Sequence, residues 1–286
     1  MPDSPTVHQR RLRIDLRKAR EAAGLTQEQA AKGLEWSLSK IIRIEGGTVR
    51  VAVSDVRVML QQYGVPQERF DEFLTLARAA RETAWWSAYR RVLSPQMAEL
   101  IGFESAAGVS REFQPLVIPG LLQTSSYAKE ILSNLRTDDA ADQVDELVEV
   151  RIRRQEIFEG DTPPRFFFVI DEAAIRRPVG GDTVMRAQLS HLLEMAKRPN
   201  VTIEIVPFAH GAHPGLVGPF KLIEFAEPED DDVLYLEGAQ GELIGRDYRE
   251  EVVRYREKFE VLRNISLGPE GSAVLLNTVA ESLRTG

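Results

Sequence analysis

Two helix-start signals lie a short distance apart in the stretch Gly24-Leu-Thr-Gln-Glu-Gln-Ala-Ala-Lys-Gly-Leu-Glu-Trp-Ser-Leu-Ser-Lys-Ile-Ile-Arg-Ile-Glu-Gly-Gly47. Thr26 and Ser37 are residue types that cap helix N-termini, and each begins a segment compatible with a short helix. Apolar residues follow each cap at helical spacing: Ala30, Ala31 and Leu34 after the first, and Ile41 and Ile44 after the second. The stretch therefore predicts two short helices joined by a tight turn.

An apolar stripe precedes this pair of helices. Leu12, Leu16, Ala19 and Ala23 recur at i, i+4, i+7 and i+11, which is the spacing of one helix face. Gly24 follows as a stop, because glycine readily adopts the left-handed conformation that ends many helices. We expect a third helix that packs over the pair and completes a compact three-helix nucleus.

The second short helix has two faces of different character. Its inward set is Trp36, Ile41 and Ile44, and the residues left on the opposite face are Leu38, Ser39, Ile42 and Arg43. Exposed apolar side chains are unusual on a helix that is only solvated. They suit a helix in the DNA major groove, where they meet thymine methyl groups while polar neighbours reach base edges or phosphates. The alternative is an ordinary helical hairpin whose outer apolar residues pack on the C-terminal part of the chain.

A known pattern matches several residues in and around these helices, namely Leu25-Thr-Gln-Glu28, Ala31, Leu34, Ser37, Ser39, Ile41, Arg43-Ile-Glu45 and Gly47. They resemble the XRE (Cro-type) helix-turn-helix of bacterial and phage repressors, over residues 10–64. The base-reading positions implied by this resemblance are Leu38, Ser39, Ile42 and Arg43. The phosphate contacts that it implies are Gln27, Ser37, Lys40, Thr48 and Arg50.

The resemblance also implies a scaffold salt bridge, in which Arg20 pairs with Glu45 without touching a base. Ile42 departs from the family, which often has a polar residue at that position. We therefore expect a methyl contact or a reading of DNA shape there, and no direct hydrogen bond to a base.

The net charge of −8 is unevenly distributed along the chain. Residues 1–50 hold ten Lys and Arg against six Asp and Glu, a charge of +4, so the remaining residues carry −12. A basic N-terminal part on an acidic body fits a protein whose DNA-reading part is small, because the acidic body repels the phosphate backbone and limits non-specific binding. Segregation of this size can also arise by chance.

Composition excludes some classes of site and compartment. The chain has no Cys, which excludes disulfides, thiolate metal sites and cysteine nucleophiles. No apolar run approaches the length of a membrane span, and the N-terminus lacks the charged and then apolar order of a signal peptide. We expect a cytoplasmic, nucleoid-associated protein with no membrane contact, no metal and no cofactor.

Three parts are predicted along the chain. Residues 1–9, with two prolines, form a disordered tail, and residues 10–82 form an all-α five-helix DNA-binding head. Ser54 is expected to cap the fourth helix, and Pro66 opens the fifth. Residues 83–286 form a regulatory and dimerisation domain, which begins beside the Trp85-Trp86 pair.

The C-terminal domain has a mixed pattern. Residues 95–159 are predicted to be helical with interruptions. Short apolar or alternating runs then predict strands at residues 165–170, 201–206, 219–225 and 233–236. Helices are expected over residues 183–197, 247–264 and 269–283. This domain is therefore predicted to be α/β (α+β), with a sheet of about four strands covered by helices.

Several segments of this domain carry a second resemblance: Pro115-Leu-Val-Ile-Pro-Gly-Leu-Leu-Gln-Thr124, Arg177-Pro-Val-Gly-Gly181, Met185-Arg-Ala-Gln188, Arg198-Pro-Asn-Val-Thr202 and Gly211-Ala-His-Pro-Gly215. They are similar to the C-terminal domain that follows this helix-turn-helix in many actinomycete transcription regulators, over residues 85–280. The resemblance implies a developmental regulator that works beside a small partner protein in an antitoxin-like arrangement.

One segment favours an enzyme. His210 and His213 lie in a loop just after a predicted strand, where they could share a metal or act as acid and base. A structural or effector-binding loop is the alternative that we favour, since no matching carboxylate motif is visible. Asp171 and Glu172, after the strand at residues 165–170, are expected to cap a helix. The chain has no nucleophile elbow, phosphate loop or dinucleotide-binding glycine pattern, so no catalytic residue is predicted.

These observations predict a sequence-specific DNA-binding transcriptional regulator, such as a repressor. We expect a homodimer on a palindromic operator in double-stranded DNA, because one head of this size makes too few contacts for tight specific binding. The C-terminal domain would sense a ligand or a small partner protein. The alternative function is an antitoxin-like interaction module, whose main activity is to capture that partner protein.

Overall fold

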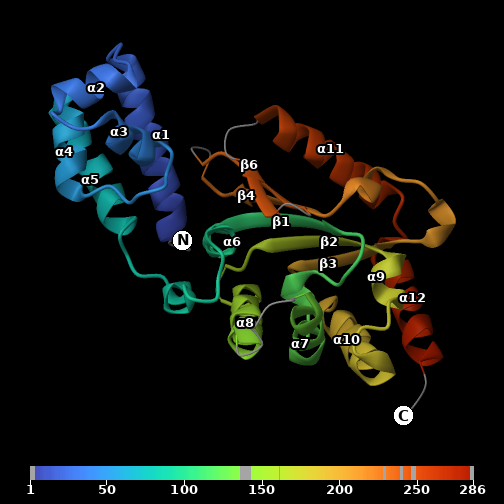
Figure 1. Cartoon of the computed structure of the whole chain (residues 1–286). Helices are drawn as coiled ribbons and strands as arrows, with labels where there is room; N and C mark the ends of the chain where they lie inside the picture. The colour runs from blue at the N-terminus through green and yellow to red at the C-terminus, as the bar shows by residue number, and fades with distance from the viewer. Residues whose placement is uncertain are drawn as a thin grey trace. The chain divides into compact units, whose positions relative to one another are not determined.

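The computed structural model of the chain describes residues 4–135, 143–160, 162–227, 230–238, 241–245 and 249–283. The chain divides into two compact units, Met1–Ser87 and Ala88–Gly286 (Figure 1). The first compact unit ends five residues after the predicted boundary at residue 82, and it includes the Trp85-Trp86 pair. Each unit is described below by itself.

The first unit contains the five α-helices expected from the sequence. They are α1 (Pro5–Ala22), α2 (Gln27–Gly33), α3 (Leu38–Glu45), α4 (Val53–Gln62) and α5 (Phe70–Ala79). Their apolar faces meet in one core, in which Leu16, Ile41 and Val56 are fully buried. Helices this short are marginal in isolation, so this shared core stabilises the unit.

Local signals set the ends of α2 and α3 as expected. The Thr26 hydroxyl accepts a hydrogen bond from the Gln29 backbone N–H at 3.2 Å, and the Gln29 side chain accepts one from the Thr26 N–H at 2.9 Å. Ser37 Oγ accepts from the Lys40 N–H in the same way at 3.3 Å. Gly24, which separates α1 from α2, has φ of +70°, a conformation that residues with a Cβ rarely adopt. These caps satisfy N–H groups that a helix N-terminus would otherwise leave unpaired.

Two sequence predictions for this unit are wrong. Residues 5–9 are not a disordered tail but the first turns of α1, because Pro5 occupies a position where the missing N–H costs nothing and Val7 is buried. Residues 1–3 lie outside the described part of the chain. Ser54 does not cap α4, since the helix begins at Val53 after Ala52, whose side chain makes no capping hydrogen bond.

The second unit contains, within the described residues, a six-stranded sheet in the order β3-β2-β1-β4-β5-β6. The strands are β1 (Ala107–Gln114), β2 (Arg165–Asp171), β3 (Val201–Val206), β4 (Phe220–Phe225), β5 (Val233–Gly238) and β6 (Gly241–Gly245). Strands β1, β2 and β3 are parallel, and the pairs β1–β4, β4–β5 and β5–β6 are antiparallel. The mixed fold class is confirmed, but the expected number of strands is too low because β1 and β6 were not predicted.

The strand β1 replaces part of a region that was predicted to be helical. Its Ser110 and Glu112 are 1% and 3% exposed, so polar residues occupy positions that face the interior. Polar residues at buried positions hide the apolar alternation by which a half-buried strand is detected. The burial of Glu112 is explained by the neighbouring strand β4, which places Lys221 beside it.

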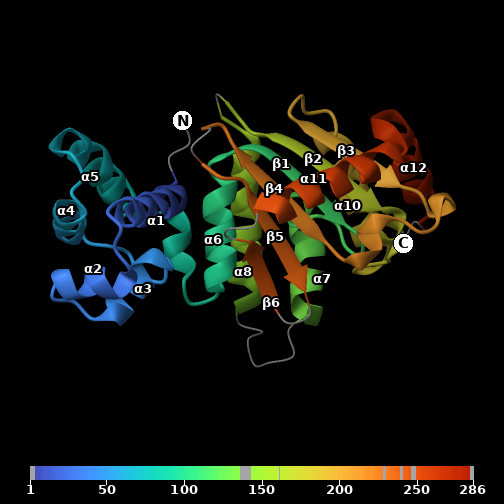
Figure 2. The same cartoon turned by 90° about the horizontal axis from the view of Figure 1, so that it is seen from above.

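Helices cover both faces of the sheet. Figure 1 shows α7, α8 and α10 on one face and α11 on the other, and Figure 2 gives the view from above. The helices are α6 (Pro95–Glu104), α7 (Ser125–Leu135), α8 (Val144–Arg153), α9 (Glu172–Arg176), α10 (Gly181–Met195), α11 (Arg249–Asn264) and α12 (Gly268–Ser282). Along β2, Phe166 and Phe168 pack in the core with α7, α10 and α12, whereas Val169 packs in the core with α11. This alternation is that of a strand buried on both faces.

The outer edge of β3 is closed by the start of α12. The Leu267 N–H donates to the Ile205 carbonyl at 2.9 Å, and the Ile205 N–H donates to Ser272 Oγ at 2.8 Å. These bonds satisfy backbone groups that an edge strand would expose for pairing with another chain. Among the helices that the structure describes, none combines the length and the apolar content needed to cross a membrane.

Candidate functional site

The outward face of α3 carries the four residues predicted to read DNA bases. Leu38 and Ile42 are 41% and 48% exposed, and Ser39 and Arg43 are exposed beside them. Arg43 Nε donates to the Ser39 carbonyl one turn earlier, at 3.3 Å, which leaves the rest of its guanidinium directed away from the backbone. Ile41 and Ile44 on the opposite face are buried. The helix therefore exposes a face of apolar and basic side chains, while its opposite face is packed in the core of the unit.

A buried ion pair holds α3 in position. Glu45, at the end of α3, is 1% exposed and accepts hydrogen bonds from Arg20 Nε at 2.6 Å and Arg20 Nη2 at 2.9 Å. The structure thus contains the expected Arg20–Glu45 pair. Arg20 Nη1 donates to the Leu25 carbonyl at 2.7 Å, so one guanidinium ties α1 to α3 and to the turn before α2. The hydrogen bond to Glu45 also raises the pKa of Arg20, and this side chain stays charged at any physiological pH.

Gln27 takes part in this scaffold. Its Nε2 donates to Glu45 Oε2 at 2.8 Å, so the amide that was predicted to meet a phosphate points into the head in this structure. Glu45 thereby receives three side-chain hydrogen bonds, which satisfy most of the acceptor capacity of a buried carboxylate. A phosphate contact by Gln27 would have to use its backbone N–H or a different side-chain rotamer.

The remaining candidates for phosphate contacts lie at both ends of α3. Ser37, Thr48 and Arg50 are exposed, and Thr48 Oγ1 donates to the Arg43 carbonyl at 3.2 Å. Lys40 is half-buried, with its Nζ 2.8 Å from Asp55 Oδ2 and 3.4 Å from the centroid of the Trp36 ring. Lys40 must therefore leave an ion pair and a cation–π contact to reach a phosphate, whereas Arg50 is exposed.

The sequence reasoning missed a set of contacts from α1 to the C-terminus of α3. Arg17 Nη2 donates to the Glu45 carbonyl at 3.0 Å, Arg13 Nη1 to that of Gly46 at 3.4 Å, and Gln9 Nε2 to that of Gly47 at 3.5 Å. These cations and amide donors satisfy carbonyls that the end of a helix leaves unpaired. Their spacing of four residues along α1, which places them on one helix face, is the signal that could have revealed them.

In the loop that contains His210 and His213, the side chain of His213 is held by contacts within the protein. His213 Nε2 lies 3.0 Å from Asp171 Oδ2, and His213 Nδ1 accepts from the Gly215 N–H at 3.2 Å. Both ring nitrogens thus have partners within the protein, and the Gly215 N–H favours the tautomer with the proton on Nε2. His210 is exposed, and the described residues contain no group of three or more His, Asp or Glu side chains arranged to hold a metal.

The carboxylates beside this loop also have structural partners. Asp171 Oδ1 accepts from the Ala173 N–H at 2.8 Å and caps α9, as expected. Glu172 accepts from the Phe208 N–H at 2.7 Å and from Arg176 Nε at 2.6 Å. Asp171 therefore joins the start of α9 to His213, and Glu172 joins α9 to the segment after β3.

Comparison with known protein families gives a separate match for each of the two units. Residues 11–73 match the family model described as "Helix-turn-helix domain". Residues 97–278, more than half of the chain, match the family described as "Domain of unknown function (DUF5753)". The chain belongs to the DUF5753 family. No curated protein and no solved structure matches it.

The two matches agree with the two units of the structure. The helix-turn-helix match covers α2, α3 and the scaffold pair, and supports a DNA-binding regulator. The DUF5753 match covers all six strands, and its description assigns no activity.

Proposed function

We propose that this DUF5753 protein is a sequence-specific DNA-binding transcriptional regulator of the XRE (Cro-type) class, with α3 as its recognition helix. The observation that carries this proposal is the exposed face of Leu38, Ser39, Ile42 and Arg43 on a helix anchored by a buried ion pair. A recognition helix must be rigid as well as exposed, because base contacts lose most of their discrimination when the reading side chains are poorly held.

The chemistry of this face sets the mode of reading. Arg43 can donate two parallel hydrogen bonds to guanine O6 and N7, and Ser39 can donate to or accept from either kind of base edge. Leu38 and Ile42 would meet thymine methyl groups or sense the shape of the groove. Arg50 and Thr48, in the segment after α3, would contact the phosphate backbone and set the register.

A homodimer on a palindromic operator forms part of the proposal. One α3 helix offers four reading side chains, whereas tight specific binding usually needs two such helices on half-sites about one helical turn apart. The second unit would supply regulatory and dimerisation surfaces without catalysis. The occupied nitrogens of His213 support this non-enzymatic role. Cytoplasmic location beside the nucleoid and an actinomycete source with repressor activity belong to the same proposal.

The alternative, an antitoxin-like module that captures a small partner protein, is favoured by one feature of the second unit. Leu116, Phe208, Leu216 and Val217 are 57%, 56%, 64% and 74% exposed and line one groove of about 480 Å³. Exposed apolar side chains that gather in one place are typical of protein-binding surfaces. Capture of a specific partner by the chain, with no operator recovered by genomic selection, would favour this alternative.

Substitution of single basic residues tests the main proposal. A genomic selection with the full chain first yields the operator, and fluorescence anisotropy then measures affinity against salt for each variant. We expect Arg43→Ala to cost about 1–3 kcal/mol and to relax discrimination at one base position. Arg50→Ala should weaken binding to all sequences alike and reduce the slope of log K against log salt by about 1.

Two further variants sharpen this test. Lys40→Ala should have a smaller effect than Arg50→Ala, because binding through Lys40 first requires loss of its pair with Asp55. Arg78→Ala is the matched control, since it removes an exposed cation of the same unit from α5, outside the α2–α3 pair. Equal, salt-insensitive losses in the three variants Arg43→Ala, Arg50→Ala and Lys40→Ala would contradict the proposed docking.

A further inference from the structure

One face of the sheet changes from apolar to ionisable residues at β1. The strand registers align one row across it: Ile203, Phe168, Glu112, Lys221 and Tyr235 on β3, β2, β1, β4 and β5. Residues aligned in this way point to the same side of a sheet. The opposite face packs against α11 through an apolar centre that includes Phe113, Val169 and Leu222, with ion pairs such as Arg111–Glu224 and Arg263–Glu204 around it. The row of Glu112, Lys221 and Tyr235 lies on the side of β1, β4 and β5 to which α6 and α8 contribute cavity residues.

Four charged side chains in this region neutralise one another. Arg154 donates to both oxygens of Glu104, at 3.1 and 2.9 Å. Lys221 pairs with Glu104 as well and lies 2.8 Å from Glu112 Oε2. Burial by itself would raise the pKa of Glu104, but the Arg154 and Lys221 cations outweigh burial and hold that pKa at about 2. Two cations and two anions therefore form a closed, buried network.

Arg151 lies one helical turn before Arg154 and adds a further positive charge to the same place. Its Nη1 donates to Gln123 Oε1 at 2.7 Å. The carboxylate of Glu237 lines the same cavity and, with Glu112 and Glu104, attracts this guanidinium, but no carboxylate of the described residues forms an ion pair with it. Gln123 is itself fixed, because its Nε2 donates to the Ile118 carbonyl at 2.7 Å. Burial, and then the neighbouring Arg154, lowers the pKa of Arg151 to about 10, so it is charged at neutral pH. Arg151 is half-buried, and its direct hydrogen-bond partner among the described residues is a neutral amide, so its other N–H groups can take an anion.

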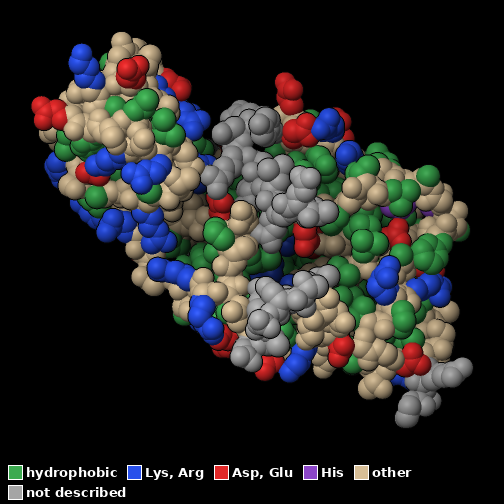
Figure 3. All heavy atoms as spheres, viewed as in Figure 1, with side chains coloured by type: hydrophobic (Ala, Val, Ile, Leu, Met, Phe, Trp, Pro, Cys, Tyr) green, Lys and Arg blue, Asp and Glu red, His purple; other side chains and the backbone are tan. Residues whose placement is uncertain are grey.

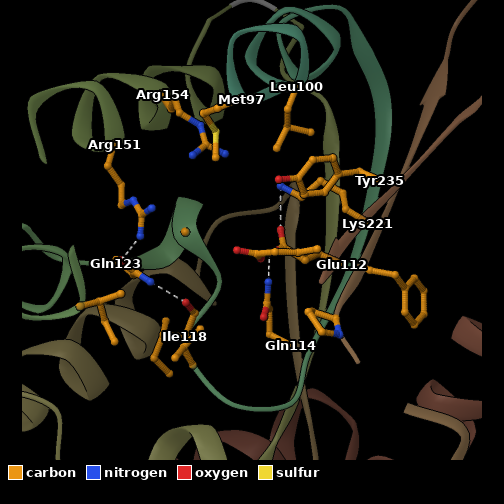
Figure 4. A pocket seen from close by; sticks show the side chains of 16 residues that line it. Met97, Leu100, Glu112, Gln114, Ile118, Gln123, Arg151, Arg154, Lys221 and Tyr235 are labelled. Carbon is orange, nitrogen blue, oxygen red and sulfur yellow. Dashed lines mark hydrogen bonds and ion pairs between the residues drawn. The ribbon is translucent and has the colours of Figure 1, made fainter. Parts of the chain in front are cut away.

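A cavity of about 100 Å³ lies between these side chains. Figure 4 shows Arg151 and Arg154 on the helix side of the cavity and Glu112, Lys221 and Tyr235 on the strand side. In Figure 3, Lys and Arg side chains lie in a recess between the sheet and the helices α7 and α8. Much of the wall is apolar, with side chains that include Met97, Leu100, Ile118 and Ile131.

Size and wall chemistry limit what such a cavity can hold. A dry cavity of about 150 Å³ in another protein accommodates benzene, which has six non-hydrogen atoms, so a cavity of about 100 Å³ suits an organic molecule on the order of four or five such atoms. The apolar wall disfavours a bare inorganic anion, which would lose its hydration without compensation on that side. A guanidinium with free donors suits a planar carboxylate.

We propose that this cavity binds a small organic carboxylate, whose carboxylate group pairs with Arg151 and whose apolar body lies against Met97 and Leu100. The closed network of Glu104, Arg154, Lys221 and Glu112 then serves as the rigid polar wall of the site. The ligand supplies a carboxylate in direct contact with Arg151, which the described residues do not.

The test uses the purified full-length protein without DNA. Isothermal titration calorimetry is performed with acetate and propanoate, with their neutral amides acetamide and propanamide, and with inorganic phosphate. At least one carboxylate should bind saturably and at least about tenfold more tightly than its amide, the difference expected for a charge-assisted hydrogen bond in place of a neutral one. Phosphate should bind more weakly than that carboxylate.

Three variants test whether Arg151 binds the carboxylate. Arg151→Gln should reduce carboxylate affinity to that of the amide, Arg151→Lys should give an intermediate affinity, and the exposed Arg153→Gln on the same helix should match the natural protein. Without ligand, the unfolding temperature of Arg151→Gln should be little changed, because the substitution breaks no ion pair among the described residues. If Arg151 had only a structural role, its replacement would instead lower the unfolding temperature.

Several results would overturn the proposal. These are carboxylates that bind no better than their amides, no binding of either carboxylate up to its solubility limit, full affinity in Arg151→Gln, and phosphate binding equal to that of the organic acids. Since the assay contains no operator, its outcome is independent of whether α3 reads DNA.

Discussion

Replacement of Glu45 by glutamine isolates the interaction that holds the recognition helix. The side chain keeps its shape and loses its charge, which leaves the Arg20 guanidinium, 7% exposed, without its counter-ion. Removal of one partner from a buried ion pair costs about 3–5 kcal/mol, of which the amide oxygen recovers a part through its remaining hydrogen bonds. We therefore expect Glu45→Gln to lower the free energy of unfolding of the first unit by about 3 kcal/mol.

The three tryptophans make this measurement possible in the full chain. Trp36, Trp85 and Trp86 all belong to the first unit, and the sequence of the second unit contains none. Tryptophan fluorescence during urea denaturation therefore reports the unfolding of the first unit alone. With a urea dependence of about 1–3 kcal/mol per molar, the midpoint should fall by roughly 1–3 M.

Glu21→Gln is the matched control. Glu21 pairs with the same arginine, at 3.5 Å from Arg20 Nη2, but is 59% exposed. Exposed pairs contribute about 0–1 kcal/mol, so the control should shift the midpoint little. Equal midpoints for Glu21→Gln and Glu45→Gln would refute the assignment of Glu45 as the anchor of α3. A double variant that replaces both Arg20 and Glu45 with methionine should regain part of the loss, because no unpaired charge remains buried.

Two further predictions concern ionisable groups. Glu104 has a pKa of about 2 in the folded protein against an ordinary 4.5, so its contribution to stability is present above pH 4.5 and is lost as the pH falls towards 2. That contribution is on the order of 3 kcal/mol, and Glu104→Gln should flatten the acid limb of far-UV circular dichroism unfolding curves; an unchanged limb would contradict this. The Tyr63 hydroxyl is buried, with no hydrogen-bond partner among the described residues, and burial followed by Glu45 raises its pKa to about 12. Tyr63→Phe should therefore leave the first unit equally stable or stabilise it by up to about 1 kcal/mol in the same fluorescence assay, and a loss of about 2 kcal/mol would show that the hydroxyl is bonded.

The helix-turn-helix could be predicted from the sequence because its determinants are local. Thr26 and Ser37 cap helices that begin at the next residue, and Gly24 ends α1 through a backbone conformation that it adopts without strain. The inward and outward faces of α3 follow from helical periodicity alone. The beginning of α1 at Pro5 also follows a local rule, because proline is favoured at the first position of a helix. In the sequence, the two prolines near the N-terminus instead suggested disorder.

The polar interior of the second unit was decided by tertiary structure. Glu112 on β1 interrupts the apolar alternation of its strand, and its burial is tolerable only because β4 places Lys221 beside it. The partners of Glu104 lie 50 and 117 residues away, at Arg154 and Lys221. Pairing over such separations leaves no periodic signal in the chain. Local caps and spacing therefore determine the reading helix from sequence, whereas the charge balance around Arg151 exists only once the strands and helices have come together.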